Sequence, residues 1–170
     1  IFADQHQFDR VYIASNYSKV SDDGGKTWTP INTKRKHVDD HAMAFHPTDP
    51  DFVLMGSDGG IYMSHDRMAN WRFMANLPLT QFYKVAPDDS KPFYKIYAGA
   101  QDNSTQGGPS RTMREEGIKN KDWFLTLGGD GHGPATEPGN PDIVYSQWQQ
   151  GNLTRVDMKT REGVYIKPQP

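Results

Sequence analysis

The chain has 170 residues, with 19 Lys and Arg against 21 Asp and Glu, a formal net charge of −2 and 35% hydrophobic residues. No apolar run approaches the roughly 18 residues of a membrane span, and the near-neutral charge argues against nucleic acid or a membrane surface as partner. The absence of cysteine excludes disulfides, thiolate metal sites and cysteine nucleophiles.

The first predicted repeat covers approximately residues 8–31 and has a β-rich run at Val11–Ser15, with no visible strand before it. Its last turn has the pattern Ser-x-Asp-x-Gly-x-Thr-Trp, carried by Ser21, Asp23, Gly25 and Trp28. The Asp can accept backbone N–H bonds within a tight turn, the Gly would take a positive φ, and the Trp would bury. We therefore expect this turn to fasten the fold without chemistry of its own.

The second repeat, approximately residues 37–76, shows the complete unit. Four short runs rich in β-branched and aromatic residues predict strands at His41–Phe45, Phe52–Gly56, Ile61–Ser64 and Trp71–Met74. The turn pattern recurs at Ser64, Asp66 and Trp71, with Met68 in the place of the glycine. The basic run Lys34–Lys36 before this repeat is expected to be a solvated loop.

The third and fourth repeats, approximately residues 81–127 and 131–167, align with the first two at Ile96–Ala100 and Val144–Gln147. The third lacks the Trp-bearing turn and carries residues 106–120 in its place. A period of about 40–50 residues with β-rich runs is typical of propeller blades. The sequence therefore predicts an all-β propeller segment, residues 1–170, of about four four-stranded blades. Since ring closure protects edge strands, we expect the remainder of a larger propeller as a partner.

At the Trp-bearing turns the chain resembles the BNR-repeat, or Asp-box, β-propeller family, which includes sialidases, xyloglucanase-type hydrolases and sortilin-like receptors. Nearly the whole chain is similar to large exported bacterial propellers of the BNR-repeat glycosyl hydrolase or sortilin-like type. The segments that carry this similarity are His37–His41, Gly56–Gly60, Gln81–Tyr83, Gln101–Asn103, Gly128–Gly131 and Gln150–Arg155. The resemblance implies a secreted, periplasmic or cell-surface protein with an extracellular glycan or protein ligand.

Blade connectivity predicts where chemistry would gather. In an up-and-down blade, the turns between the second and third strands share one face, which we call the top, with the connections between blades. Loops on a rigid scaffold commonly carry function. The candidate catalytic carboxylates of the top face are Asp39, Asp40, Asp58, Asp102 and Asp130. The candidate ligand-binding residues are Gln81, Tyr83, Gln101, Asn103, Gln147 and Trp148, and His132 and Gln149 lie in the same loops.

Three uses of this face remain open. The first is a module that binds extracellular ligands, with glycans favoured by the resemblance. The second is glycoside hydrolysis by a pair of carboxylates, one of them protonated, with aromatic platforms for the sugar. The third is a sortilin-like scaffold that binds a protein or peptide.

A metal site is a further hypothesis. His37, Asp39 and His41 alternate, so on an extended strand their side chains would point to one side. Nitrogen and oxygen ligands of this kind suit zinc or another divalent ion. No phosphate-binding Gly pattern precedes a helix, so we do not expect nucleotide chemistry. We expect no cofactor apart from such a divalent ion.

Overall fold

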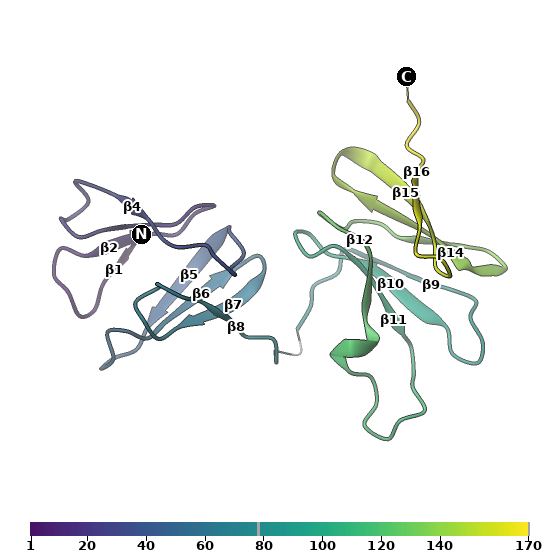
Figure 1. The fold of residues 1–170 in the computed structure, drawn as a ribbon, viewed down its shortest axis with the longest axis horizontal. Coiled ribbons are helices and arrows are strands. Elements are labelled where there is room, and N and C mark those ends of the chain that lie inside the picture. Colours follow the sequence, from purple (N-terminus) through teal and green to yellow (C-terminus); the bar gives the residue numbers. More distant parts are fainter. Residues whose placement is uncertain (78, 170) are drawn as a thin grey trace. The chain divides into compact units, whose positions relative to one another are not determined.

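The computed structural model describes residues 1–77 and 79–169, and the chain divides into two compact units, unit 1 (Ile1–Pro78) and unit 2 (Leu79–Pro170). Four four-stranded antiparallel sheets are present, two in each unit (Figure 1). In every sheet the strands pair in chain order, so each sheet is an up-and-down meander that resembles a propeller blade. The predicted all-β class and the predicted four four-stranded blades are confirmed.

The first sheet of unit 1 consists of β1 (Phe2–Ala3), β2 (Val11–Ile13), β3 (Lys19–Ser21) and β4 (Thr29–Pro30). The expectation that this blade lacks a first strand is wrong, because β1 pairs with β2. A two-residue strand has no alternation for a sequence pattern to reveal, and its pairing partner lies further along the chain.

The second sheet of unit 1 consists of β5 (Asp40–Phe45), β6 (Val53–Ser57), β7 (Gly60–Ser64) and β8 (Arg72–Phe73). The two sheets of unit 1 bury a shared core. Its fully buried hydrophobic members are Tyr12, Ile31, Val53, Met55, Tyr62, Met68 and Trp71. Because this cluster draws side chains from both blades, each blade is stabilised by its neighbour as well as by its own strand pairing.

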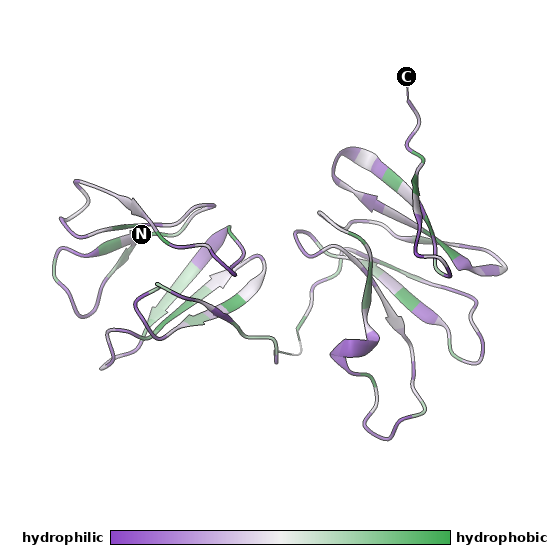
Figure 2. Ribbon diagram, in the orientation of Figure 1, coloured by the Kyte–Doolittle hydropathy of each residue, from purple (hydrophilic) through white to green (hydrophobic). Residues whose placement is uncertain are grey.

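Unit 2 repeats the arrangement. Its first sheet is β9 (Lys84–Pro87), β10 (Lys95–Gly99), β11 (Thr105–Pro109) and β12 (Phe124–Leu127). Its second sheet is β13 (Ala135–Glu137), β14 (Asn140–Trp148), β15 (Asn152–Asp157) and β16 (Gly163–Tyr165). The turns between strands are mostly hydrophilic, whereas hydrophobic residues lie on the strands (Figure 2).

Helical structure is slight. The described residues contain two 3-10 turns, η1 (Asn120–Asp122) before β12 and η2 (Gln149–Gly151) between β14 and β15. Neither turn has the length or the apolar character that a bilayer-spanning helix needs.

The first Trp-bearing turn is closed by a network around Asp23. Its Oδ1 accepts the backbone N–H groups of Lys26 at 2.9 Å and Thr27 at 2.8 Å, and the Thr27 hydroxyl donates to Oδ2. Gly25 has φ 91° and donates its N–H to the Ser21 hydroxyl at 2.8 Å. The Thr27 N–H, then the Thr27 and Ser21 hydroxyls, lower the pKa of Asp23 to about 2. These bonds agree with a turn whose role is structural.

The second Trp-bearing turn shows how a methionine can take the place of the glycine. Met68 adopts φ 69° and donates its N–H to the Ser64 hydroxyl at 2.8 Å, as Gly25 does to Ser21. A left-handed conformation is unfavourable for a residue with a Cβ. The Met68 side chain is 4% exposed and belongs to the core of unit 1, so its burial offsets the backbone cost.

Candidate functional site

The candidate site is a pocket of about 410 Å³ in unit 2, at one end of its two sheets. Four segments build it. They are the end of the connection into β9, the turn after β10, the connection between β12 and β13, and the end of β14 with η2. These are the connections that blade topology assigns to the top face, so the pocket lies where the sequence predicts polar loops to gather.

Backbone hydrogen bonds hold the β12–β13 connection in place between its neighbours. The Gly131 N–H donates to the Ala100 carbonyl at 3.0 Å, and the His132 N–H donates to the Gln147 carbonyl at 3.2 Å. The connection is therefore fastened to both sheets of unit 2. Since loops held this way lose little entropy when a ligand binds, the pocket is pre-formed.

Two glycines permit this close approach. A Cβ on Gly131 would lie 2.1 Å from the Ser104 carbonyl oxygen, and a Cβ on Gly99 would lie 2.4 Å from the His132 carbonyl oxygen. Both obstacles are backbone atoms, which cannot move aside without breaking the loop. The close packing of the β12–β13 connection thus requires glycine at both positions.

Asp130 is held at the edge of the pocket by the turns on either side. Its Oδ1 accepts the Asp102 N–H at 3.1 Å, and its own N–H donates to Gln149 Oε1 at 3.2 Å. Asp130 is the one carboxylate among the described residues that line the pocket. It therefore supplies the fixed negative charge of the lining.

Aromatic rings share the lining of the pocket with this carboxylate. The Tyr83 hydroxyl donates to Gln101 Oε1, and the Tyr83 and His132 ring centroids are 5.5 Å apart. Trp148, at the end of β14, packs against Tyr165 with ring centroids 5.8 Å apart. Tyr83 is 51% exposed, so much of its ring is available to a ligand.

Five of the predicted catalytic and ligand-binding candidates meet in this pocket, namely Tyr83, Gln101, Asp130, Gln147 and Trp148. Gln81, Asn103 and Asp102 lie in the same loops of unit 2 but are not part of the lining. The pocket also takes in Gly131, His132, Gln149, Gln150 and Gly151. Gln150 and Gly151 enter through η2, where both take positive φ, and Gly151 is the turn signal that could have indicated them.

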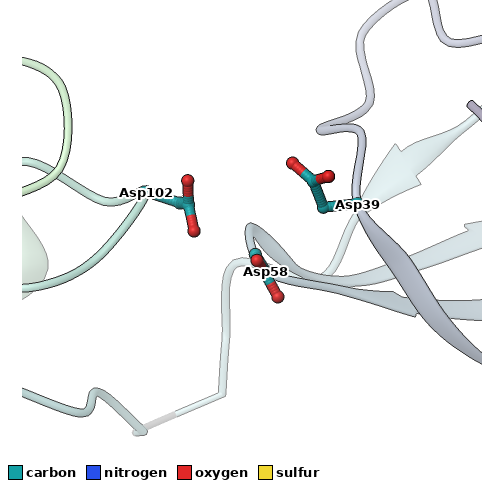
Figure 3. Close-up of side chains that lie close together, drawn as sticks. All are labelled: Asp39, Asp58 and Asp102. Carbon is teal, nitrogen blue, oxygen red and sulfur yellow. The ribbon is translucent and has the colours of Figure 1, made fainter. Parts of the chain in front are cut away.

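The top loops of unit 1 hold other candidate acids. Figure 3 shows Asp39 before β5 and Asp58 in the β6–β7 turn, and their carboxylate oxygens lie within 4.8 Å of each other. His41 Nε2 lies 2.6 Å from Asp58 Oδ1. The His41 side chain in this pair is 68% exposed. Asp102, also labelled in Figure 3, belongs to unit 2, where its N–H contacts Asp130.

The strand geometry expected for the histidine-containing metal site is wrong. The strand β5 begins at Asp40, so His37 and Asp39 precede it, and Asp39 takes φ 62°. His37 Nδ1 lies 2.7 Å from the Val38 carbonyl oxygen, whereas His41 faces Asp58. The left-handed residue breaks the alternation that would have aligned the three side chains.

Asp40 is engaged in a buried network. It forms an ion pair with the Lys36 ammonium, with the two side chains 2% and 1% exposed, and it accepts the Ser18 hydroxyl at 2.6 Å. The Lys36 ammonium lies 5.7 Å from the ring centroid of Tyr62 and 5.6 Å from that of Trp71. Asp40 is therefore placed to hold the inter-blade connection, and the expectation of a solvated loop at Lys34–Lys36 is wrong for Lys36.

The unit 2 pocket has the chemistry of a binding site. Glycoside hydrolysis needs two carboxylates on either side of the scissile bond, and the described lining supplies Asp130 alone. Aromatic faces, amide donors and acceptors and one acid are groups that bind and orient a polar ligand.

Comparison with protein-family models and with curated proteins gives no match. Solved structures give distant likenesses. YCF48 bound to the D1 peptide has a TM-score of 0.37 and 14% identity over 94% of this chain and 51% of that chain. The GH74 xyloglucanase from Xanthomonas campestris has a TM-score of 0.35 and 12% identity over 93% of this chain and 28% of that chain. The GH74 enzyme from Niastella koreensis has a TM-score of 0.34 and 11% identity over 95% of this chain and 29% of that chain. The chain thus spans about half the length of YCF48 and less than a third of the two enzymes.

Proposed function

We propose that this chain is part of an exported BNR-repeat β-propeller that binds an extracellular glycan in the unit 2 pocket. The observation that carries the proposal is the composition of the pocket. Two aromatic side chains, Tyr83 and Trp148, share it with four glutamines and a single carboxylate.

Each class of group suits a sugar. Pyranose rings present patches of C–H groups that pack on aromatic faces, and their hydroxyls both donate and accept hydrogen bonds. Amide side chains offer both functions, and the lining takes four glutamines from two different blades, namely Gln101, Gln147, Gln149 and Gln150. A pocket of about 410 Å³ lies within the usual range for small-ligand sites.

Binding is favoured over hydrolysis because Asp130 is the one carboxylate among the described lining residues, and glycoside hydrolysis needs two. It also includes export to the periplasm, the cell surface or the medium, which follows from the family resemblance at the Trp-bearing turns. A glycan outside the cell agrees with both the composition of the pocket and the export of the protein.

The test is a glycan-array screen of the chain followed by calorimetric titration of each hit. We expect Tyr83→Ala and Gln149→Ala to weaken binding at least about tenfold, since each removes a pocket contact. Tyr17→Ala and Gln5→Ala are matched controls, because these exposed residues lie in unit 1, and they should bind as the parent does.

Two results would contradict the proposal. Hits whose affinity is unchanged by both pocket substitutions would place the glycan elsewhere. Reducing ends released during incubation with a hit would show hydrolysis in place of simple binding.

A further inference from the structure

The charge of the unit 2 pocket is one-sided. The described lining contains Asp130 and the imidazole of His132, and none of its members is Lys or Arg. Lys84 and Lys167 of unit 2 lie outside the lining. Lys167 donates to the Gln150 carbonyl at 3.0 Å, and Lys84 passes its aliphatic Cδ within 3.7 Å of a Cβ built on Gly133. An anionic ligand would therefore meet a carboxylate without a cation to balance it.

Asp130 lines the pocket, and its two carboxylate oxygens differ in their hydrogen bonds. Oδ1 accepts the Asp102 N–H, while Oδ2 has no hydrogen-bonding partner among the described residues. The Gln149 amide fixes the Asp130 backbone, so the carboxylate is oriented before a ligand arrives. An ionised carboxylate oxygen can only accept, so the group that satisfies Oδ2 must be a donor, and a cationic donor makes the stronger bond.

The rings around this acid favour a cation as well. Tyr83 and His132 lie with centroids 5.5 Å apart, and Trp148 lines the same pocket. The face of an aromatic ring attracts an ammonium group, most strongly for Trp and Tyr, and the attraction grows where water is partly excluded. An acid beside aromatic faces, with no basic residue in the lining, is thus selective for a positively charged group.

The geometry points to an amino-sugar glycan as the ligand, one that carries a free amino group like that of glucosamine. Its ammonium would donate to Asp130 Oδ2 beside the rings of Tyr83 and Trp148. The glutamine amides would bind the hydroxyls of the same and adjacent sugars, which a single lysine side chain of a peptide would leave unused. This inference rests on the proposed function, since it names the chemical class of the glycan that the pocket binds.

The experiment compares three tetrasaccharides that differ in the group on the second carbon of each sugar. Chitosan tetramer carries an amine, chitin tetramer an acetamide and cellotetraose a hydroxyl. Calorimetric titration of the full chain should give at least about tenfold tighter binding of the chitosan tetramer than of the other two. Added salt should reduce that difference because the discriminating contact is electrostatic.

Asp130→Asn tests the carboxylate directly. The amide oxygen can still accept the Asp102 N–H, so the loop should keep its structure, and thermal melting checks that it does. We expect chitosan binding to fall to the level of cellotetraose. Asp9→Asn, at an exposed acid of unit 1, is the matched control and should leave the preference unchanged.

The outcomes separate this inference from the proposed function. Equal binding of all three tetramers, each weakened by Tyr83→Ala, would overturn the amino-sugar inference and leave glycan binding in place. A lysine-rich peptide that binds through Asp130 while the chitosan tetramer does not would overturn it in favour of a peptide ligand. A glycan array without hits, together with no detectable binding of any of the three tetrasaccharides by calorimetry, would overturn both proposals.

Discussion

Lys36 and Asp40 form a buried ion pair in unit 1, four residues apart in the connection that leads into the second blade. The Ser18 hydroxyl from the first blade donates to the same carboxylate, and the Asp40 N–H donates to the Ser15 carbonyl at 3.0 Å. Lys36 also donates to the His37 carbonyl at 2.8 Å. The pair therefore ties the connection to both blades.

Removing one member of this pair should be strongly destabilising. Lys36→Met leaves the Asp40 carboxylate buried without its counter-ion, and we expect the free energy of unfolding to fall by about 3–5 kcal/mol in urea titrations. The double variant Lys36→Met, Asp40→Leu should recover part of that loss, because it leaves no uncompensated charge. Lys34→Met, at an exposed position of the same basic run, serves as the control with a change within about 0.5 kcal/mol. A loss no larger for Lys36→Met than for Lys34→Met would mean that the pair is solvated.

Met68 in the second Trp-bearing turn makes two opposing contributions to stability, one from its backbone and one from its side chain. Met68→Gly relieves the left-handed backbone, worth about 1–2 kcal/mol, and removes a buried side chain, worth about 2–5 kcal/mol. We expect a net loss of about 1–3 kcal/mol in the free energy of unfolding. Met113→Gly, where the side chain is 88% exposed, should cost less. A Met68→Gly variant more stable than the parent would show that backbone strain outweighs the packing.

Repetition explains how much of the fold could be predicted. The Ser, Asp and Thr residues of the first turn form hydrogen bonds within a few residues of the chain, so their sequence pattern also specifies those bonds. Strand order then follows from chain order, since each blade is an antiparallel meander. The strand β1 was not predicted, because its two residues are defined by their pairing with β2 and no local pattern marks them.

The site could be predicted in outline for the same topological reason. Tyr83, Gln101, Asp130 and Trp148 come from four separate segments, and blade connectivity assigns all four segments to the same face. What could not be predicted depends on contacts distant in sequence. The sequence around Lys36 predicts a solvated side chain, but in the structure its ammonium lies over the rings of Tyr62 and Trp71.

The conformation of single residues was equally hidden from the pattern. Asp39 leaves the β region, and this one change of φ separates His37 from the strand that carries His41. Asp tolerates the left-handed region better than most residues, so a sequence that alternates His and Asp does not require an extended chain there.

The first Trp-bearing turn should respond to acid. The hydrogen bonds from Thr27 and Ser21 hold the pKa of Asp23 at about 2, against 3.8 for an ordinary Asp. Because the folded pKa is the lower one, these bonds contribute their full stability above pH 3.8, and the contribution is lost as the pH falls towards 2. A carboxyl NMR titration of Asp23 should give a midpoint near 2.

Thr27→Val tests the cause of that shift. It removes the hydroxyl donor but keeps the backbone N–H, so the Asp23 midpoint should move upward without reaching 3.8. Thr29→Val is the control, because its hydroxyl donates to the Val20 carbonyl and not to Asp23. A parent midpoint at 3.8 would mean that the turn is open in solution.

The close packing of Gly131, a residue that lines the unit 2 pocket, gives the last prediction. Gly131→Ala would place a methyl group 2.1 Å from the Ser104 carbonyl oxygen, so the β12–β13 connection must shift away from β10. We expect a loss of about 1–3 kcal/mol in stability, the range of ordinary overpacking, together with loss of glycan binding as Asp130 moves. Gly128→Ala in the same connection is the matched control, since a Cβ there meets nothing within 4 Å. If Gly131→Ala bound glycan and unfolded as Gly128→Ala does, the connection would not pack against the β10–β11 turn in solution, and the pocket would not be pre-formed.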